Sequence, residues 1–143
     1  DARLTLAAGP ADAFDILAVD AFSSDAVPMH LLTHEAIGVY DRALRPDGLL
    51  LVHISNRYID LKPVLAAAAD AKGWHAMILT DTPERPELHT SVWVALARDA
   101  RELAKLREQD RDASWEPLAR RPDFAGWSDD HASILPLLKG WIP

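Results

Sequence analysis

An apolar segment over Phe14–Phe22, which reads FDILAVDAF, constrains the fold of this chain more than any other part of it. Nearly every position from Phe14 to Val19 is apolar, and acidic residues follow at once. Strands that are buried on both faces of a parallel sheet have this continuous pattern, whereas half-exposed strands alternate between apolar and polar residues. The segment therefore predicts a strand inside a sheet that is covered by helices.

A helix and a second strand follow in the order of a β-α-β unit. Thr33 is placed to cap the helix, and apolar residues from Ile37 to Leu44 recur at the spacing of one helical face. Residues 46–48 (PDG) form a turn, and Leu49–Ile54 is a second apolar run of strand length. These two strands are expected to be parallel, because a helix of this length can serve as their crossover.

The next elements indicate that the sheet is mixed. A second helix is expected over Leu61–Lys72, with Gly73 as the residue that ends it. Trp74–Thr80 and His89–Ala97 are predicted to be strands, and eight residues lie between them. A parallel crossover needs a dozen residues or more, so this pair is expected to be antiparallel.

Beyond Arg98 the chain becomes more polar. Asp99 and Glu102 have the spacing of a capping box at the start of a charged helix, and a segment with several tryptophans and prolines runs from Ala113 to Pro143. We expect residues 1–98 to form a partial Rossmann-like α/β domain, a three-layer sandwich whose parallel strands end in an antiparallel pair. Residues 99–143 are expected to form a helical and irregular tail that packs on it.

Composition excludes several classes of protein. The 143 residues suit one domain, and the absence of cysteine excludes disulfides and thiolate chemistry. Twenty-two acidic against fifteen basic residues give a net charge of -7, which disfavours nucleic acid as a partner. No apolar run approaches the ~20 residues that span a bilayer, so no membrane segment is expected. With no export signal recognised, the expected location is the cytoplasm.

Two other kinds of site are not favoured by the motifs. His30 and His34 have an i, i+4 spacing, but Thr33 would cap a helix between them and the HExxH pattern of a zinc site is absent. We therefore expect no metal site. The G-x-S-x-G motif of a serine hydrolase of the α/β type is also absent.

Several short motifs together are those of one enzyme family. They are Asp1-Ala2-Arg3, Phe14-Asp15-Ile16-Leu17-Ala18-Val19-Asp20, Pro28, Leu32-Thr33, Glu35 and Leu44-Arg45-Pro46-Asp47-Gly48. With them the chain resembles the spermidine synthase (polyamine aminopropyltransferase) family over residues 1–98. The resemblance implies the second half of a methyltransferase-like Rossmann domain.

The resemblance also implies roles for particular residues. Asp1, with Ala2, would bind the adenine of the donor, decarboxylated S-adenosylmethionine. Asp20 would orient and deprotonate the attacking amine, a polyamine such as putrescine, and Asp25 would help to hold that amine. Two alternatives remain open, namely a methyltransferase that uses S-adenosylmethionine itself and a non-catalytic interaction module. A further alternative is that the chain is a fragment of a longer protein and has no activity of its own.

Elementary chemistry agrees with an acid at position 20. Ligands of open α/β sheets bind at the carboxyl ends of the strands, where Asp20 follows its strand. An alkylamine with a pKa of ~10.4 must lose a proton to attack, which costs about 4.6 kcal/mol at pH 7. A carboxylate can hold the ammonium ion first and accept its proton during attack, most effectively if the carboxylate is buried.

The chain also departs from the family pattern. No Gly-rich nucleotide loop is present, the loop from Asp20 to Pro28 lacks the usual Asp-Pro pair, and His53 and Ser55 stand where the family often has Gln and Glu. The strand Phe14–Val19 would also lack the neighbour that the family has on its other side. We therefore expect either a homo-oligomer formed through this edge or coverage of the edge by the tail.

Overall fold

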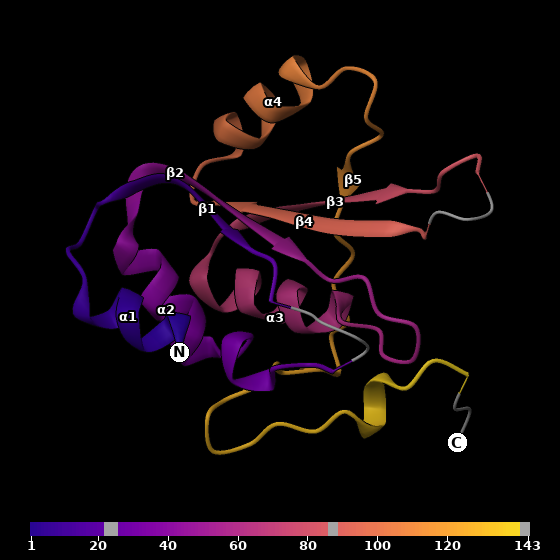
Figure 1. Ribbon diagram of the computed structural model, residues 1–143, viewed down its shortest axis with the longest axis horizontal. Helices are drawn as coiled ribbons and strands as arrows, with labels where there is room; N and C mark the ends of the chain where they lie inside the picture. Colours follow the sequence, from indigo (N-terminus) through magenta and orange to yellow (C-terminus); the bar gives the residue numbers. More distant parts are fainter. Residues whose placement is uncertain (22–25, 86–88, 141–143) are drawn as a thin grey trace.

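The computed structural model describes residues 1–21, 26–85 and 89–140 (Figure 1). Its helices are α1 (Ala2–Ala8), α2 (His34–Ala43), α3 (Lys62–Lys72) and α4 (Ala100–Gln109), with short 3-10 helices η1 (Met29–Leu31) and η2 (Leu135–Leu137). The strands are β1 (Phe14–Val19), β2 (Leu44–His53), β3 (His75–Asp81), β4 (Ser91–Ala97) and β5 (Glu116–Pro117).

These strands form one sheet in the order β1-β2-β4-β3-β5. β1 and β2 are parallel, as the β-α-β reading predicted, and β4 is antiparallel to both β2 and β3. The antiparallel pairing of the strands after α3 is thus confirmed. β5, which the sequence analysis did not predict, adds two residues beside β3 at the far edge of the sheet.

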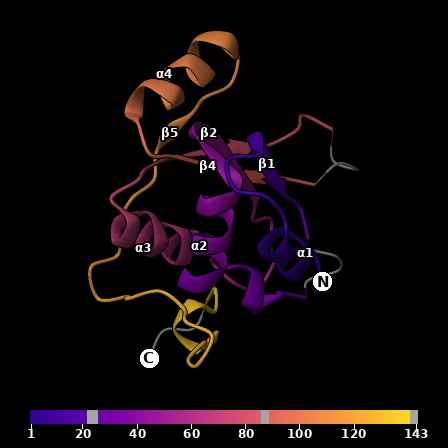
Figure 2. The same cartoon turned by 90° about the vertical axis from the view of Figure 1, so that its left-hand side faces the viewer.

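Helices cover both faces of the sheet. α1, α2 and α3 lie on one face and α4 on the other, which gives three layers (Figures 1 and 2). The strand residues divide accordingly: Leu50, Val52, Val94 and Leu96 belong to the core beside α2 and α3, whereas Ala95 and Ala97 belong to a smaller core under α4. The alternating direction of side chains along a strand produces this division.

The predicted ends of the helices correspond to real caps. The Thr33 hydroxyl accepts the Ala36 N–H at 3.2 Å and begins α2. Gly73 ends α3 with a left-handed φ of 67°, which favours glycine because it has no Cβ. The turn expected at residues 46–48 lies instead inside β2, where the pairing with β1 jumps from Phe14↔Leu44 to Ile16↔Leu49.

The expectation that β1 is buried on both faces is wrong for this chain. Phe14 is 41% exposed and Ile16 59% exposed, and only Val19 is buried. The reason is that β1 is at the end of the sheet, where it pairs with β2 alone among the described strands. The strand that the described part of the tail adds to the sheet, β5, pairs with β3 at the opposite edge.

Residues 118–138 instead return to the face of the sheet that carries α2 and α3. Trp127 and Leu137 are almost fully buried in the larger core. Nearby, the Asp129 carboxylate accepts hydrogen bonds from Arg3 of α1, at 2.6 and 2.8 Å, and from Thr33, at 2.7 Å. The bond from Arg3 is the main reason that the pKa of Asp129 falls to about 2. The tail is thus tied to α1 and to the start of α2.

We predict that Trp127→Ala lowers the free energy of unfolding by about 3–5 kcal/mol, because it leaves a large cavity in the main core. Urea denaturation followed by circular dichroism measures this change. Trp127→Phe, which keeps an aromatic ring, should cost less. An equal, small effect of both substitutions would show that Trp127 contributes little to the core.

The self-association expected through β1 remains a prediction, and the exposed Ile16 provides a test of it. An unpaired strand edge beside exposed apolar side chains favours pairing with a second chain, and a lysine there disfavours it. Ile16→Lys should therefore weaken the dimer in sedimentation velocity experiments. Leu135→Lys, at an equally exposed leucine on η2, should not. A wild-type chain that is monomeric at all concentrations would contradict this prediction.

Candidate functional site

The site begins where β1 and β2 end side by side. Their parallel register pairs Val19 with Val52, so Asp20 and His53 are the next neighbours along the two strands. The Asp20 carboxylate and His53 Nδ1 are 2.8 Å apart. Because a carboxylate only accepts hydrogen bonds, Nδ1 must carry the proton that joins them.

The His53 ring is held on its other sides as well. Its Nε2 lies 2.6 Å from the Ser55 hydroxyl oxygen, and that oxygen accepts the Val92 N–H at 2.8 Å. The ring also stacks on Trp93, with 4.8 Å between the ring centroids. β2 and β4 thus fix both the position and the orientation of the imidazole, and through it one oxygen of Asp20.

The contacts from Asp20 through His53 to Ser55 have the order found in serine hydrolases, where the serine is the nucleophile. Here the Ser55 oxygen is also tied to β4 by the Val92 N–H. Activity of that kind further needs N–H donors around a developing oxyanion, for which nothing in the described site provides an arrangement. We therefore interpret Ser55 as the group that holds His53.

Asp20 also lines a cavity of about 440 Å³ between β1, α1 and α2. Its walls are mostly apolar and include Ala2 and Leu6 from α1, Leu17 from β1 and Tyr40 from α2. The Tyr40 hydroxyl donates to the Leu31 carbonyl at 2.9 Å, and burial raises its pKa to about 12. The phenol therefore stays neutral, and Asp20 is the acidic residue among the described residues that line the cavity.

Only some of the predicted site residues lie together in the structure. Asp20 and Ala2 line the same cavity. Asp1 is the N-cap of α1: its carboxylate accepts the Arg3 N–H at 2.9 Å and lies 3.3 Å from His30 Nε2. Asp25 lies outside the described residues. The Asp20 side chain is 58% exposed, so the described residues do not provide the enclosure that would make it a better base.

His53 is the residue of the site that the sequence analysis did not assign. It entered only as a departure from the family pattern, together with Ser55. The signal that could have found it is its place at the end of the strand paired with β1, one residue after the partner of Val19.

Two features are absent from the described part of the chain. No group of three or more His, Asp or Glu side chains there is arranged to hold a metal ion. His30 and His34 in particular lie on different elements, η1 and α2. No described helix has the length and apolar character needed to cross a membrane.

Comparison with known proteins gave one kind of match. No protein-family model and no curated protein sequence matches this chain. Among solved structures, it is similar to a probable spermidine synthase from Corynebacterium glutamicum, with a TM-score of 0.64 and 17% sequence identity over 94% of this chain. The match covers 54% of the other chain, so this chain spans about half the length of its structural neighbour. The fold is accordingly a partial methyltransferase-like Rossmann fold of the spermidine synthase type.

The geometry around His53 predicts a single tautomer. In the neutral ring, Nδ1–H donates to Asp20 and Nε2 accepts from the Ser55 hydroxyl, so long-range ¹H–¹⁵N NMR should show a protonated Nδ1 and a bare Nε2. Removing the acceptor with Asp20→Ala should give a mixture of tautomers. His75, which is on the exposed first residue of β3, serves as the internal control. A bare Nδ1 in the wild type would contradict the assignment.

Proposed function

We propose that this chain forms the amine-binding part of a spermidine synthase-like transferase, which moves an aminopropyl group from decarboxylated S-adenosylmethionine to an amine. The observation that carries the proposal is the position of Asp20. It follows a parallel strand at the carboxyl edge of the sheet, lines a largely apolar cavity, and is held by His53. The fold that the chain shares with a probable spermidine synthase supports the same assignment.

In the proposed reaction Asp20 acts first on the charge of the acceptor and then on its proton. The carboxylate binds the ammonium group, and its Oδ1 is fixed by His53 so that the other oxygen faces the substrate. One proton passes from the ammonium group to Asp20, and the electron pair that it leaves on the nitrogen attacks the methylene carbon beside the sulfonium sulfur. A C–N bond forms while the C–S bond breaks, and the sulfur departs as a neutral thioether.

The apolar cavity is the proposed place of the donor. Its walls of α1 and β1 suit the uncharged parts of a nucleoside, and Ala2 belongs to them. Asp1, at the start of the same helix, would accept the adenine amino group. Asp25, which follows Asp20 in the chain, would contribute a second negative charge toward the amine. A polyamine such as putrescine is the acceptor that the family resemblance implies.

Two other functions use the same site. A methyltransferase would take S-adenosylmethionine as donor and move a methyl group to the amine that Asp20 holds. A non-catalytic interaction module would bind neither donor. Methylthioadenosine, which contains the donor without its transferable group, separates this last possibility from the other two because only a transferase should bind it.

We expect isothermal calorimetry to detect binding of methylthioadenosine, and turnover to depend on Asp20. With an amine acceptor and each sulfonium donor in turn, Asp20→Asn should lower kcat by about 10²–10⁴-fold, because it removes the general base. Asp15→Asn is the matched control, since this acid lies on the same strand and is paired with Arg45 on the surface. Equal rates for Asp20→Asn and the wild type would remove Asp20 from the mechanism.

A further inference from the structure

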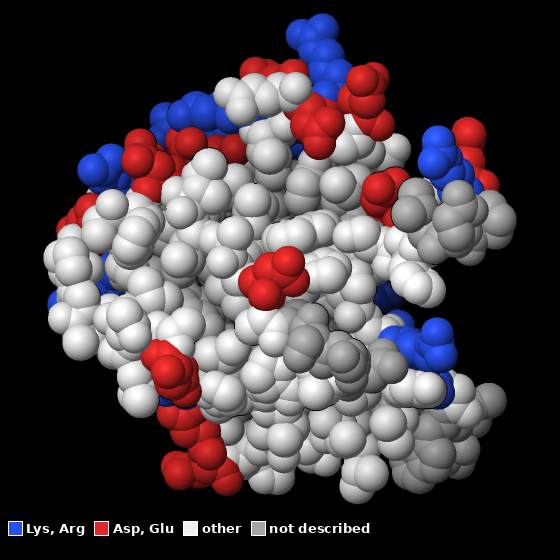
Figure 3. Space-filling model, in the orientation of Figure 1, with Lys and Arg blue, Asp and Glu red and all other residues white. Residues whose placement is uncertain are grey.

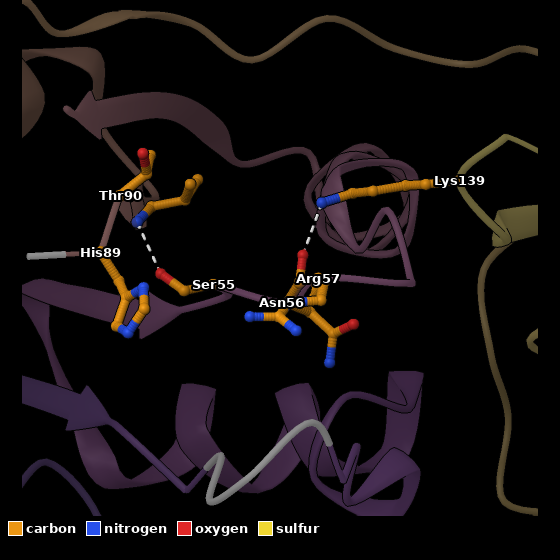
Figure 4. A pocket seen from close by; sticks show the side chains of 7 residues that line it. Ser55, Asn56, Arg57, His89, Thr90 and Lys139 are labelled. Atoms are coloured by element: carbon orange, nitrogen blue, oxygen red, sulfur yellow. Dashed lines mark hydrogen bonds between the residues drawn. The ribbon is translucent and has the colours of Figure 1, made fainter. Parts of the chain in front are cut away.

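A second hollow lies next to the His53–Ser55 pair and takes no part in the proposed reaction. It has a volume of about 520 Å³, and three segments that are distant in the sequence line it. Figure 4 shows Ser55 and Arg57 arriving from the segment after β2, His89 and Thr90 from the segment before β4, and Lys139 from the last part of the tail. In Figure 3 a recess with basic side chains at its lower rim lies at the right-hand margin, on the side of the molecule where β3 ends and β4 begins.

The charge of this hollow is opposite to that of the whole chain. Arg57 and Lys139 line it together with His89, and no acidic side chain is among the described residues of its lining, although the chain carries a net charge of -7. Neighbouring cations repel one another in the absence of a counter-charge, so their convergence without an acid favours a negatively charged ligand.

The two cations are also available to such a ligand. The Arg57 guanidinium makes no hydrogen bond or ion pair with any described residue. Lys139 Nζ donates one hydrogen bond, to the Asn56 carbonyl at 2.6 Å, which fixes the amine at the wall of the hollow and leaves two of its three donors (Figure 4). Arginine binds carboxylates and phosphates through paired N–H donors, and lysine adds a point charge. Thr90 lines the hollow as well, from the segment before β4.

We infer that this hollow binds an anionic group, a carboxylate or a phosphate, through Arg57 and Lys139. Ser55 connects it to the site already described, because this residue lines the hollow and its hydroxyl contacts His53, which in turn contacts Asp20. A ligand that spans both places would therefore carry a positive charge at Asp20 and a negative charge at Arg57.

For the acceptor this inference rests on the proposed function, but it replaces the polyamine that the family resemblance implies. A polyamine would place its second ammonium group near Arg57 and Lys139, where it is repelled. An amine whose far end is a carboxylate or phosphate matches both charges. The acceptor class indicated by the hollow is thus an amine with an anionic tail.

The test compares ligands that differ only in the charge of one end. The full chain is titrated with inorganic phosphate, 4-aminobutanoate and 1,4-diaminobutane, and binding is followed by ¹H–¹⁵N NMR at the backbone amides of Ser55, His89 and Thr90. We expect phosphate and 4-aminobutanoate to shift these signals and the diamine to leave them unchanged. The affinity should fall as sodium chloride is added, because the contact is between charges.

Variants then show whether the two cations are responsible. Arg57→Gln and Lys139→Gln should each weaken the binding of phosphate at least about tenfold, since each removes a charged hydrogen-bond donor. Arg107→Gln, at an exposed arginine in the last turn of α4, is the matched control and should bind as the wild type does. Two separate variants keep the test valid if one of them fails to fold.

The outcomes separate this inference from the proposed function. Absence of phosphate-induced shifts, or equal affinities for Arg57→Gln, Lys139→Gln and Arg107→Gln, would overturn the anion site. Turnover of 1,4-diaminobutane in preference to 4-aminobutanoate would overturn the acceptor class while leaving the transferase proposal intact. Binding of anions that depends on Arg57, in a chain that transfers nothing from either donor, would support the anion site and overturn the transferase proposal instead.

Discussion

The parallel pairing of β1 with β2 is the constraint on which the candidate site depends. A shift of this register by one residue would place Ile54 instead of His53 beside Asp20. Such a shift is opposed by the core, because it would turn the buried Leu50 and Val52 toward the other face of the sheet. The register of β1 and β2 therefore determines both the packing of β2 in the core and the contact between Asp20 and His53.

That alignment also explains why an exposed carboxylate can have a defined position. Asp20 is more than half exposed, and its side chain would be free to rotate if solvent alone surrounded it. The His53 ring, which is itself held by Ser55 and by stacking on Trp93, provides a fixed partner. β4 thus influences Asp20 through His53, the last residue of β2, and through Ser55, which follows that strand.

Local patterns in the sequence were sufficient for most of the sheet and its helices. The caps at Thr33 and Gly73 follow from short-range chemistry, and the length of the loop after β3 gave the direction of β4. The exposure of β1 was missed because an apolar run reports that a strand can be buried, not whether a neighbour covers it. α1 and β5 carried too few residues to give a periodic signal.

The candidate site was only partly visible in the sequence for a different reason. The role of Asp20 was assigned from the family resemblance, and the rule that strand ends of α/β sheets bind ligands agreed with it; both depend on one element alone. The partnership with His53 depends on the register of two strands, and the convergence of Arg57 with Lys139 depends on where the tail returns. Residues separated by 82 positions in the sequence have no local pattern that joins them.

The reversed direction of β4 has a consequence for what the sheet can recognise. In an all-parallel sheet, only the C-terminal ends of the strands lie at the ligand-binding edge, and all the N-terminal ends lie at the opposite edge. Because β4 is antiparallel to β2, the N-terminal end of β4, preceded by His89 and Thr90, lies beside the C-terminal end of β2 at that edge. One antiparallel strand thereby adds a third wall to this edge. The proposed ligand can then contact the sheet at both of its ends.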